Sequence, residues 1–398
     1  MKTEQGMGKY DFDEIIERKK TNSLKYDFAV QRGMPEDILP LWVADMDFRT
    51  PREVTEALVK KAEHGIFGYS EPFDDYFEAI EKWFTGHFHW TPEKNRLVLS
   101  CSVVFSICNF IEALTREGDA VIINSPVYYP FGEAVTDNRR KLVSSDLVYS
   151  DGKYHIDFED LERKIVENDV KLYILCNPHN PVGRVWRRDE LEKISEICLK
   201  HNVFVVSDEI HADFIYKGYK FVSYASLGKE ALSNAAICTS PSKTFNLAGL
   251  HNANTYIYDD EVREKFIKVQ NKKGYSQSNI MGIVACKSAY EYGGEWHKEL
   301  MGYLEENLSL VRCFLAQHIP KIRLVEPEGT YLIWLDCSGL GLSDTELNRL
   351  IVEKAGLWLD AGSMFGKVGE QFERINIACP RSTLEEALKR LNKAVREL

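Results

Sequence analysis

The strongest constraint on the fold of this chain is the alternation of short apolar runs with amphipathic segments between residues 97 and 258. The β-rich runs lie at 97–100, 119–124, 171–176, 203–207, 235–239 and 254–258. Segments with helical periodicity separate most of these runs, at 102–116, 157–168 and 188–201. Apolar runs that alternate with amphipathic helices predict an α/β fold whose mostly parallel sheet is covered by helices on both faces.

The last third of the chain has a different pattern. A long amphipathic helix is indicated by apolar residues that recur every three or four positions, namely Trp296, Leu300, Leu304, Leu308, Val311 and Leu315. Strands are predicted near 322–325, 330–335 and 372–378, and helices near 343–354 and 382–396. Strand pairs backed by helices predict a second, smaller α+β domain.

No Pro/Gly/Ser-rich linker and no internal repeat divides the chain. Pro51 follows the apolar stretch 38–48 and stands where a helix is expected to begin. We therefore expect interleaved domains rather than a string of separate ones. The predicted large domain covers residues 50–290, and the small domain combines residues 1–49, which include an N-terminal arm, with residues 291–398.

Charge and hydropathy exclude several classes of partner. Among the 398 residues, 50 Lys and Arg face 61 Asp and Glu, which gives a net charge of −11. Nucleic-acid binding requires a concentrated basic surface, so an acidic chain of this kind disfavours it. No apolar run reaches the ~18 residues of a membrane span, and the polar N-terminus does not resemble a signal peptide.

The nine cysteines indicate the compartment rather than a disulfide framework or a metal site. Their number is odd, and no C-x-x-C pair occurs. Free, buried thiols in a reducing cytosol explain this usage best, so we expect a cytoplasmic protein. His87 and His89 lie close together, but no further ligand motif accompanies them, and no metal is predicted.

Chemically distinctive residues follow the predicted strands directly. Asp208 ends the run 203–207, Lys243 follows 235–239 within Ser240-Pro-Ser-Lys, and Asn180 follows 171–176 within a rigid Asn-Pro-rich turn. Tyr128 follows the run 119–124. Taken singly, these are a helix cap, a surface lysine, a loop amide and a core aromatic. Parallel strands bring their carboxyl ends to one edge of a sheet, however, where ligands bind.

The fifth feature of this edge is a helix start. Cys101-Ser-Val-Val104 follows the first β-rich run, and free N–H groups at a helix start favour a phosphate. A lysine with a lowered pKa forms Schiff bases, and a carboxylate holds a ring nitrogen protonated. An anion site, an aromatic ring, an amide, a carboxylate and a lysine together describe a pocket for pyridoxal 5'-phosphate.

Four motifs resemble those of fold-type I enzymes, the pyridoxal-phosphate-dependent transferase-like fold of the class I/II aminotransferase superfamily. They are Asn177-Pro-His-Asn-Pro-Val-Gly183, Ser207-Asp-Glu-Ile-His211, Ser240-Pro-Ser-Lys-Thr-Phe-Asn246 and Asn376-Ile-Ala-Cys-Pro-Arg-Ser382. Leu41-Trp-Val-Ala-Asp-Met-Asp-Phe48 narrows the resemblance to the MalY/PatB branch, which contains cystathionine β-lyases and other carbon–sulfur lyases. The resemblance extends from about Phe12 to the C-terminus.

The resemblance implies roles around the cofactor ring. Lys243 would hold the cofactor and then move protons at the substrate Cα, and Asp208 would keep the pyridine nitrogen protonated. Asn180 would bond the phenolic oxygen of the ring and lie beside the substrate. Tyr128 would stack on the ring, and either Lys243, Tyr128 or a water would protonate the leaving group.

The resemblance also implies an anion site at each end of the pocket. Ser240, Ser242 and the N–H groups near Val103 and Val104 would hold the phosphate. Tyr69 would reach the phosphate of the neighbouring subunit, which implies a homodimer with shared active sites. Arg381, in Cys-Pro-Arg-Ser, would clamp the α-carboxylate of an amino-acid substrate.

Three positions depart from the pattern of many aminotransferases. His251 stands where an arginine commonly pairs with the phosphate, His211 stands where a tyrosine commonly contacts the ring, and Ser102 stands where the branch more often has glycine. We place His211 among the cofactor-binding residues. Without the arginine, phosphate binding must rely more on hydroxyl and backbone groups.

The sequence therefore predicts a carbon–sulfur β-lyase that converts cystathionine or cysteine S-conjugates into pyruvate, ammonia and a thiol. An aminotransferase is the alternative, because it would use the same lysine, aspartate and arginine. A dicarboxylate aminotransferase would need a second cation, and the stretch 271–279 offers Lys272 and Lys273 but no arginine. A regulatory, partner-binding protein on the same fold is the third hypothesis, although a purely non-catalytic scaffold should have lost Lys243, Asp208 or Arg381, and all three are present.

Overall fold

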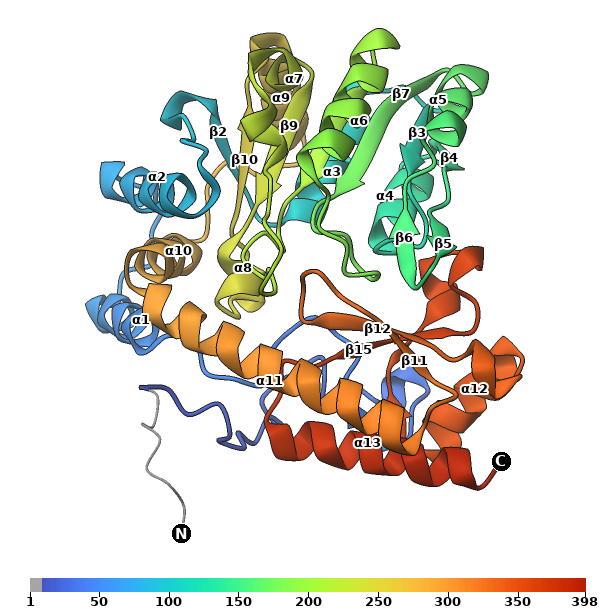
Figure 1. The fold of residues 1–398 in the computed structure, drawn as a ribbon. Coiled ribbons are helices and arrows are strands. Elements are labelled where there is room, and N and C mark those ends of the chain that lie inside the picture. Colours follow the sequence, from blue (N-terminus) through green and yellow to red (C-terminus); the bar gives the residue numbers. More distant parts are fainter. Residues whose placement is uncertain (1–8) are drawn as a thin grey trace.

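The computed structural model describes residues 9–398, which form a large sheet and a small sheet with helices packed against both (Figure 1). The large sheet has seven strands, in the spatial order β2 (Leu97–Ser100), β10 (Ala253–Ile257), β9 (Ala235–Thr239), β8 (Phe204–Asp208), β7 (Val170–Cys176), β3 (Ala120–Ile123) and β4 (Lys141–Ser144). All six predicted β-rich runs are strands of this sheet, within one or two residues of the predicted bounds.

One strand of the large sheet departs from the parallel pattern. β10 is antiparallel to both β2 and β9, and the other four neighbouring pairs are parallel. Residues 240–252 turn back at the end of β9, so β10 enters the sheet from the edge at which β9 leaves it. The prediction of a mostly parallel sheet is confirmed.

Helices cover both faces of the large sheet. Val121, Leu172 and Val206 pack in one apolar cluster with side chains of α3 (Val103–Leu114), α4 (Pro130–Asp137) and α9 (Asp260–Lys272). The alternate residues Ile122, Tyr173 and Val205 pack on the opposite face with α5 (Phe158–Glu167) and α6 (Arg188–Lys200). Successive side chains of a strand point to opposite faces, so these buried strands supply two cores at once.

Three further helices pack beside the β2 edge of the sheet. α1 (Arg52–His64) contacts α10 (Ile280–Tyr292), and α10 contacts α2 (Asp74–Phe88). α1 begins directly after Pro51, as predicted. The remaining short elements of this half are α7 (Lys229–Ser233), α8 (Pro241–Thr244) and the hairpin strands β5 (Val148–Ser150) and β6 (Lys153–His155).

The small sheet is antiparallel throughout. Its strands are β11 (Arg323–Val325), β12 (Leu332–Asp336), β15 (Phe372–Asn376) and β14 (Asp360–Ala361), in that spatial order. α11 (Gly294–His318) and α13 (Arg381–Arg396) contact each other and lie below this sheet in Figure 1, with α12 (Asp344–Arg349) near its end. The predicted apolar stripe of α11 is buried from Trp296 to Leu315.

The N-terminal arm is attached to this second half of the chain. β1 (Leu39–Pro40) pairs in parallel with β13 (Leu357–Trp358), and Asn376 N donates to Leu41 O at 2.9 Å. The division into a large domain over residues 50–290 and a small domain of residues 1–49 and 291–398 stays a prediction, supported by the separate ranges of the two sheets.

Between residues 9 and 398, no helix is both long and apolar enough to cross a bilayer. The same part of the chain contains no group of three or more His, Cys, Asp or Glu side chains arranged to hold a metal ion. All nine cysteines lie in this range and are free thiols; six are buried, Cys101 and Cys108 are partly buried, and Cys313 is exposed.

Candidate active site

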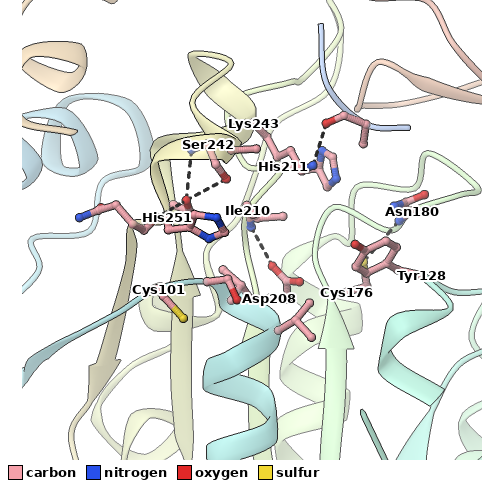
Figure 2. Close-up of a pocket in the computed structure, with 17 residues that line it drawn as sticks. Cys101, Tyr128, Cys176, Asn180, Asp208, Ile210, His211, Ser242, Lys243 and His251 are labelled. Atoms are coloured by element: carbon pink, nitrogen blue, oxygen red, sulfur yellow. Dashed lines mark hydrogen bonds between the residues drawn. The ribbon is translucent and has the colours of Figure 1, made fainter. Parts of the chain in front are cut away.

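A cavity of about 180 Å³ lies at the edge of the large sheet that faces the small sheet. Nine residues predicted from the sequence line it, and Figure 2 labels most of them: Val103, Val104, Tyr128, Asn180, Asp208, His211, Ser240, Ser242 and Lys243. They come from the C-terminal ends of β3, β7, β8 and β9 and from the start of α3. The structure thus brings the predicted strand-end residues together, while their roles remain predictions.

Lys243 projects into this cavity from α8, a helix of four residues. Its Nζ donates to the carbonyl oxygen of Ala44 at 2.7 Å, across 199 positions of the chain. Burial of the amine lowers the pKa of Lys243 to about 8, although the nearby charge of Asp45 acts in the opposite direction. A lysine with this pKa is neutral in roughly a tenth of molecules at pH 7, far more often than an ordinary lysine, and the neutral amine is the form that attacks a carbonyl group.

Asp208 ends β8 and is 5% exposed. Its Oδ1 accepts a hydrogen bond from Ile210 N at 3.0 Å, and no basic side chain among residues 9–398 lies within ion-pair distance of it. Burial raises the pKa of Asp208 to about 7. A buried carboxylate that lacks a cationic partner is costly, and a protonated ring nitrogen in the cavity would supply that partner. The residues present therefore fit the cofactor.

The phosphate end of the pocket combines a helix start with hydroxyl groups. α3 begins at Val103, and Ser102 Oγ accepts a hydrogen bond from Phe105 N at 3.1 Å. The other backbone N–H groups at the start of the helix have no partner within the helix, and Val103 and Val104 line the cavity. Ser240 Oγ donates to Asn252 O at 2.7 Å and lies 2.9 Å from Ser242 Oγ. His251 lines the same end of the cavity, at the position where many aminotransferases carry an arginine.

Two further residues flank the position of the ring. Tyr128 N donates to Asn180 O at 2.9 Å, and burial raises the pKa of the Tyr128 hydroxyl, so the phenol is neutral. His211 is 4% exposed and its Nδ1 has no hydrogen-bond partner in the described residues. Burial, together with the charge of Lys243, lowers the pKa of His211 well below its ordinary value. A neutral imidazole with an unpaired nitrogen is suited to bonding a ligand atom.

Arg381 does not lie with these residues, so its prediction as the carboxylate clamp is corrected. Its side chain is 37% exposed, pairs with Glu306 and places its guanidinium 5.4 Å from the Tyr303 ring centroid. The reason is local: Arg381 is the first residue of α13, directly after Pro380, and it contacts the adjacent helix α11.

Arg374 of β15 is the arginine that reaches the site. Its Nη1 donates to Asn180 Oδ1 at 3.0 Å, its Nη2 donates to Trp42 O at 2.8 Å, and it pairs with Asp360. It is 2% exposed, and its charge acts on Lys243 and His211. The sequence analysis missed it, although Arg374 lies within the predicted strand 372–378 and a charged residue on a strand of a packed sheet is itself a signal, because buried charged residues are rare without a role.

Tyr69 is absent from the cavity of its own chain. It lies between α1 and α2 and is 93% exposed. The structure of one chain is therefore compatible with its predicted role in a neighbouring subunit, which stays a prediction.

The chain matches the family model for aminotransferase class I and II over residues 36–391. Cystathionine beta-lyase PatB of Bacillus subtilis is 41% identical, over 97% of this chain and all of that protein. Cystalysin from Treponema denticola, solved with pyridoxal 5'-phosphate, has a TM-score of 0.94 at 36% identity, over 98% of this chain and 99% of that one. The pyridoxal-phosphate-bound C-S lyase from Staphylococcus hominis has a TM-score of 0.89 at 31% identity, with 97% and 98% coverage.

Proposed function

The chain belongs to the class I and II aminotransferase family, and from that premise we propose that it is a pyridoxal 5'-phosphate-dependent carbon–sulfur β-lyase. Its substrates would be cystathionine or other cysteine S-conjugates, and its products pyruvate, ammonia and a thiol. The observation that carries the proposal is that Lys243 and the Asp208 carboxylate, which has no cationic partner, line one buried pocket. The near-full-length similarity to PatB favours cleavage of a carbon–sulfur bond over amino transfer.

The cofactor, when bound, supplies an electron sink that stabilises negative charge at the substrate Cα. Asp208 would hold a proton at the ring nitrogen, since a carboxylate stabilises a neighbouring cation. Val103, Val104, Ser240 and Ser242 would bind the phosphate. The neutral ring of His211 and the amide of Asn180 would orient the phenolic oxygen.

Lys243 is the group placed to move the Cα proton. Its Nζ is held at the Ala44 carbonyl oxygen, and its pKa of about 8 lets it accept and return a proton near neutral pH. The same amine would protonate the departing thiolate, with the Tyr128 hydroxyl or a water as the other proton source. Tyr128 would also stack on the ring.

Arg374 takes the place of Arg381 in this proposal and would bind the substrate α-carboxylate. The guanidinium already bonds the Asn180 amide oxygen and pairs with Asp360, so its orientation is fixed before a substrate arrives. Its Nε has no hydrogen-bond partner among the described residues, so a donor of this fixed, planar group is left for the carboxylate.

The test is turnover of a panel of cystathionine, cysteine and cysteine S-conjugates by the cofactor-loaded protein. Equimolar pyruvate, ammonia and thiol are expected. Accumulation of pyridoxamine phosphate together with the keto acid of the substrate would instead establish the aminotransferase alternative. The second cation that a dicarboxylate aminotransferase needs is not supplied by Lys273, which pairs with Glu112 at 2.5 Å.

We further propose that the working assembly is a homodimer in which Tyr69 completes the phosphate site of the partner subunit. The exposure of Tyr69 and of the apolar side chains beside it supports this assembly. A cytoplasmic location, which the free thiols support, is part of the same proposal.

A further inference from the structure

The short helix that carries Lys243 cannot fix its own orientation. α8 has four residues, Pro241–Thr244, and one helical turn is unstable by itself. Its N-terminal end is fixed by Ser240, whose Oγ accepts from Ser242 N at 3.1 Å. Another group must hold the C-terminal end of α8, which is Thr244, the residue after Lys243.

That end is held by Asp213. Thr244 Oγ1 donates to Asp213 Oδ2 at 2.6 Å, and Trp83 Nε1 donates to Asp213 Oδ1 at 2.9 Å. Thr244 is 1% exposed and Trp83 is 4% exposed, so water does not compete for these two bonds. Both side-chain oxygens of Asp213 therefore accept from a buried neutral donor, so the group is fixed in one orientation.

The backbone of Asp213 is fixed as well. His297 Nε2 lies 2.9 Å from Asp213 O, which makes this nitrogen the protonated one, because a carbonyl oxygen can only accept. Burial lowers the pKa of His297, so the ring stays neutral and keeps a single proton for this bond. Asp213 thus connects α8 to α2 through Trp83 and to α11 through His297.

The loop that contains Asp213 follows Asp208, the last residue of β8, and also carries His211; Asp208 and His211 both line the cavity. Asp213 itself makes no ion pair within residues 9–398 and does not line the cavity. Its role is therefore neither to form an ion pair nor to contact a ligand. We propose that Asp213 is a positioning residue: through Thr244 it holds Lys243 in register with Asp208 and His211. This inference rests on the proposed function only in assuming that Lys243 bonds the cofactor.

The experiment measures how fast the cofactor-free protein forms the visible absorbance band of lysine-bound pyridoxal phosphate at pH 9, where most of Lys243 is neutral. Thr244→Val keeps the shape of the side chain and removes the donor. It should slow band formation roughly 5- to 20-fold, because the amine loses its attacking geometry. On a lyase substrate it should lower kcat while leaving KM near that of the unmodified protein. Thr244→Ser retains the hydroxyl and should restore both rates.

Thr115→Val is the matched control. Thr115 is a buried hydroxyl bonded to Ile111 O at the far end of α3, so its loss tests for general destabilisation. It should leave band formation unchanged.

Asp213→Asn offers one acceptor oxygen to two donors, so it should slow band formation as Thr244→Val does. It replaces Thr244→Val in the test if that variant does not fold. Normal band formation in Thr244→Val, or equal slowing in Thr115→Val, would overturn the proposal. A normal band without pyruvate formation in the unmodified protein would refute the lyase function alone.

Discussion

At the scale of single residues, the protonation state of Lys243 determines when the pocket can capture its cofactor. The neutral amine is the nucleophile, and burial has lowered its pKa to about 8. Below pH 8 the amine is mostly protonated and unreactive, so the rate of capture should rise about tenfold per pH unit there and become constant above pH 8. Stopped-flow absorbance of the cofactor-free protein with added pyridoxal phosphate measures this profile. A midpoint near the ordinary lysine value would contradict the burial argument.

The two arginines near the C-terminus give a direct test of the corrected substrate site. Arg374→Ala should raise KM for a β-lyase substrate roughly 10- to 100-fold, because a charge-assisted hydrogen bond to the α-carboxylate is lost. Arg381→Ala removes an exposed ion pair with Glu306 and should change KM less than about twofold. Steady-state kinetics with near-saturating cofactor compare the two. The reverse order of effects would restore the assignment to Arg381.

Arg374 also shows why residue roles are harder to predict than residue locations. Arg374 and Arg381 are separated by only seven positions in the sequence. Which of them reaches Asn180 depends on the pairing of β15 with β12 and β14, and on a contact between residues 194 positions apart. No local pattern contains that information, whereas Lys243, Asp208 and Asn180 were predictable because each follows a strand of the parallel sheet.

At the scale of elements, the N-cap of α3 is a test of the phosphate-binding helix start. Ser102 Oγ accepts from Phe105 N, and its backbone is extended, with φ −163° and ψ 161°. Ser102→Ala should cost about 1 kcal/mol of unfolding free energy, whereas Ser102→Gly should cost a few tenths of that. Urea unfolding of the cofactor-free protein measures both variants. Equal losses would show that the cap bond contributes little.

The elements themselves divide by burial into predictable and unpredictable ones. Central strands such as β8 and β9 are buried at every position and appear in the sequence as continuous apolar runs. β4 has two exposed residues at its start, and β5 and β6 have three residues each, so their sequences carry no clear alternation. The pairing of β1 with β13 joins two residues to two others more than 300 positions away, and only tertiary packing determines it.

At the scale of the whole molecule, the site depends on contact between the two halves of the chain. Lys243 and Asn180 follow strands β9 and β7 of the large sheet, yet their partners Ala44 and Arg374 belong to the arm and the small sheet. The Ala44 carbonyl also accepts from the Tyr331 hydroxyl at 3.0 Å, which ties the arm to the segment before β12. The pocket is therefore complete only when the arm and both sheets are packed together.

The exposed surface beside Tyr69 predicts that two chains pack together as a dimer. Residues 65–73 form no helix or strand, and Ile66, Phe67, Tyr69 and Phe73 are 66%, 59%, 93% and 83% exposed. A run of exposed apolar side chains is unusual for a monomer and indicates a contact surface. Sedimentation should give twice the mass of one chain, and Phe73→Asp should shift the population toward monomer, because it places a charge in a desolvated contact.

Tyr69→Phe separates assembly from cofactor binding. It keeps the ring and removes the hydroxyl, so the dimer should persist while the cofactor dissociates faster on dialysis, by roughly 5- to 20-fold for one lost hydrogen bond to a charged group. The Phe73→Asp variant should also lose the cofactor, and the fraction that loses it should equal the monomer fraction. The reason is that the phosphate site of a monomer lacks the partner's Tyr69. A monomeric unmodified protein with full activity, or a Tyr69→Phe variant that retains cofactor normally, would show instead that each chain completes its own phosphate site with Ser240, Ser242 and the start of α3.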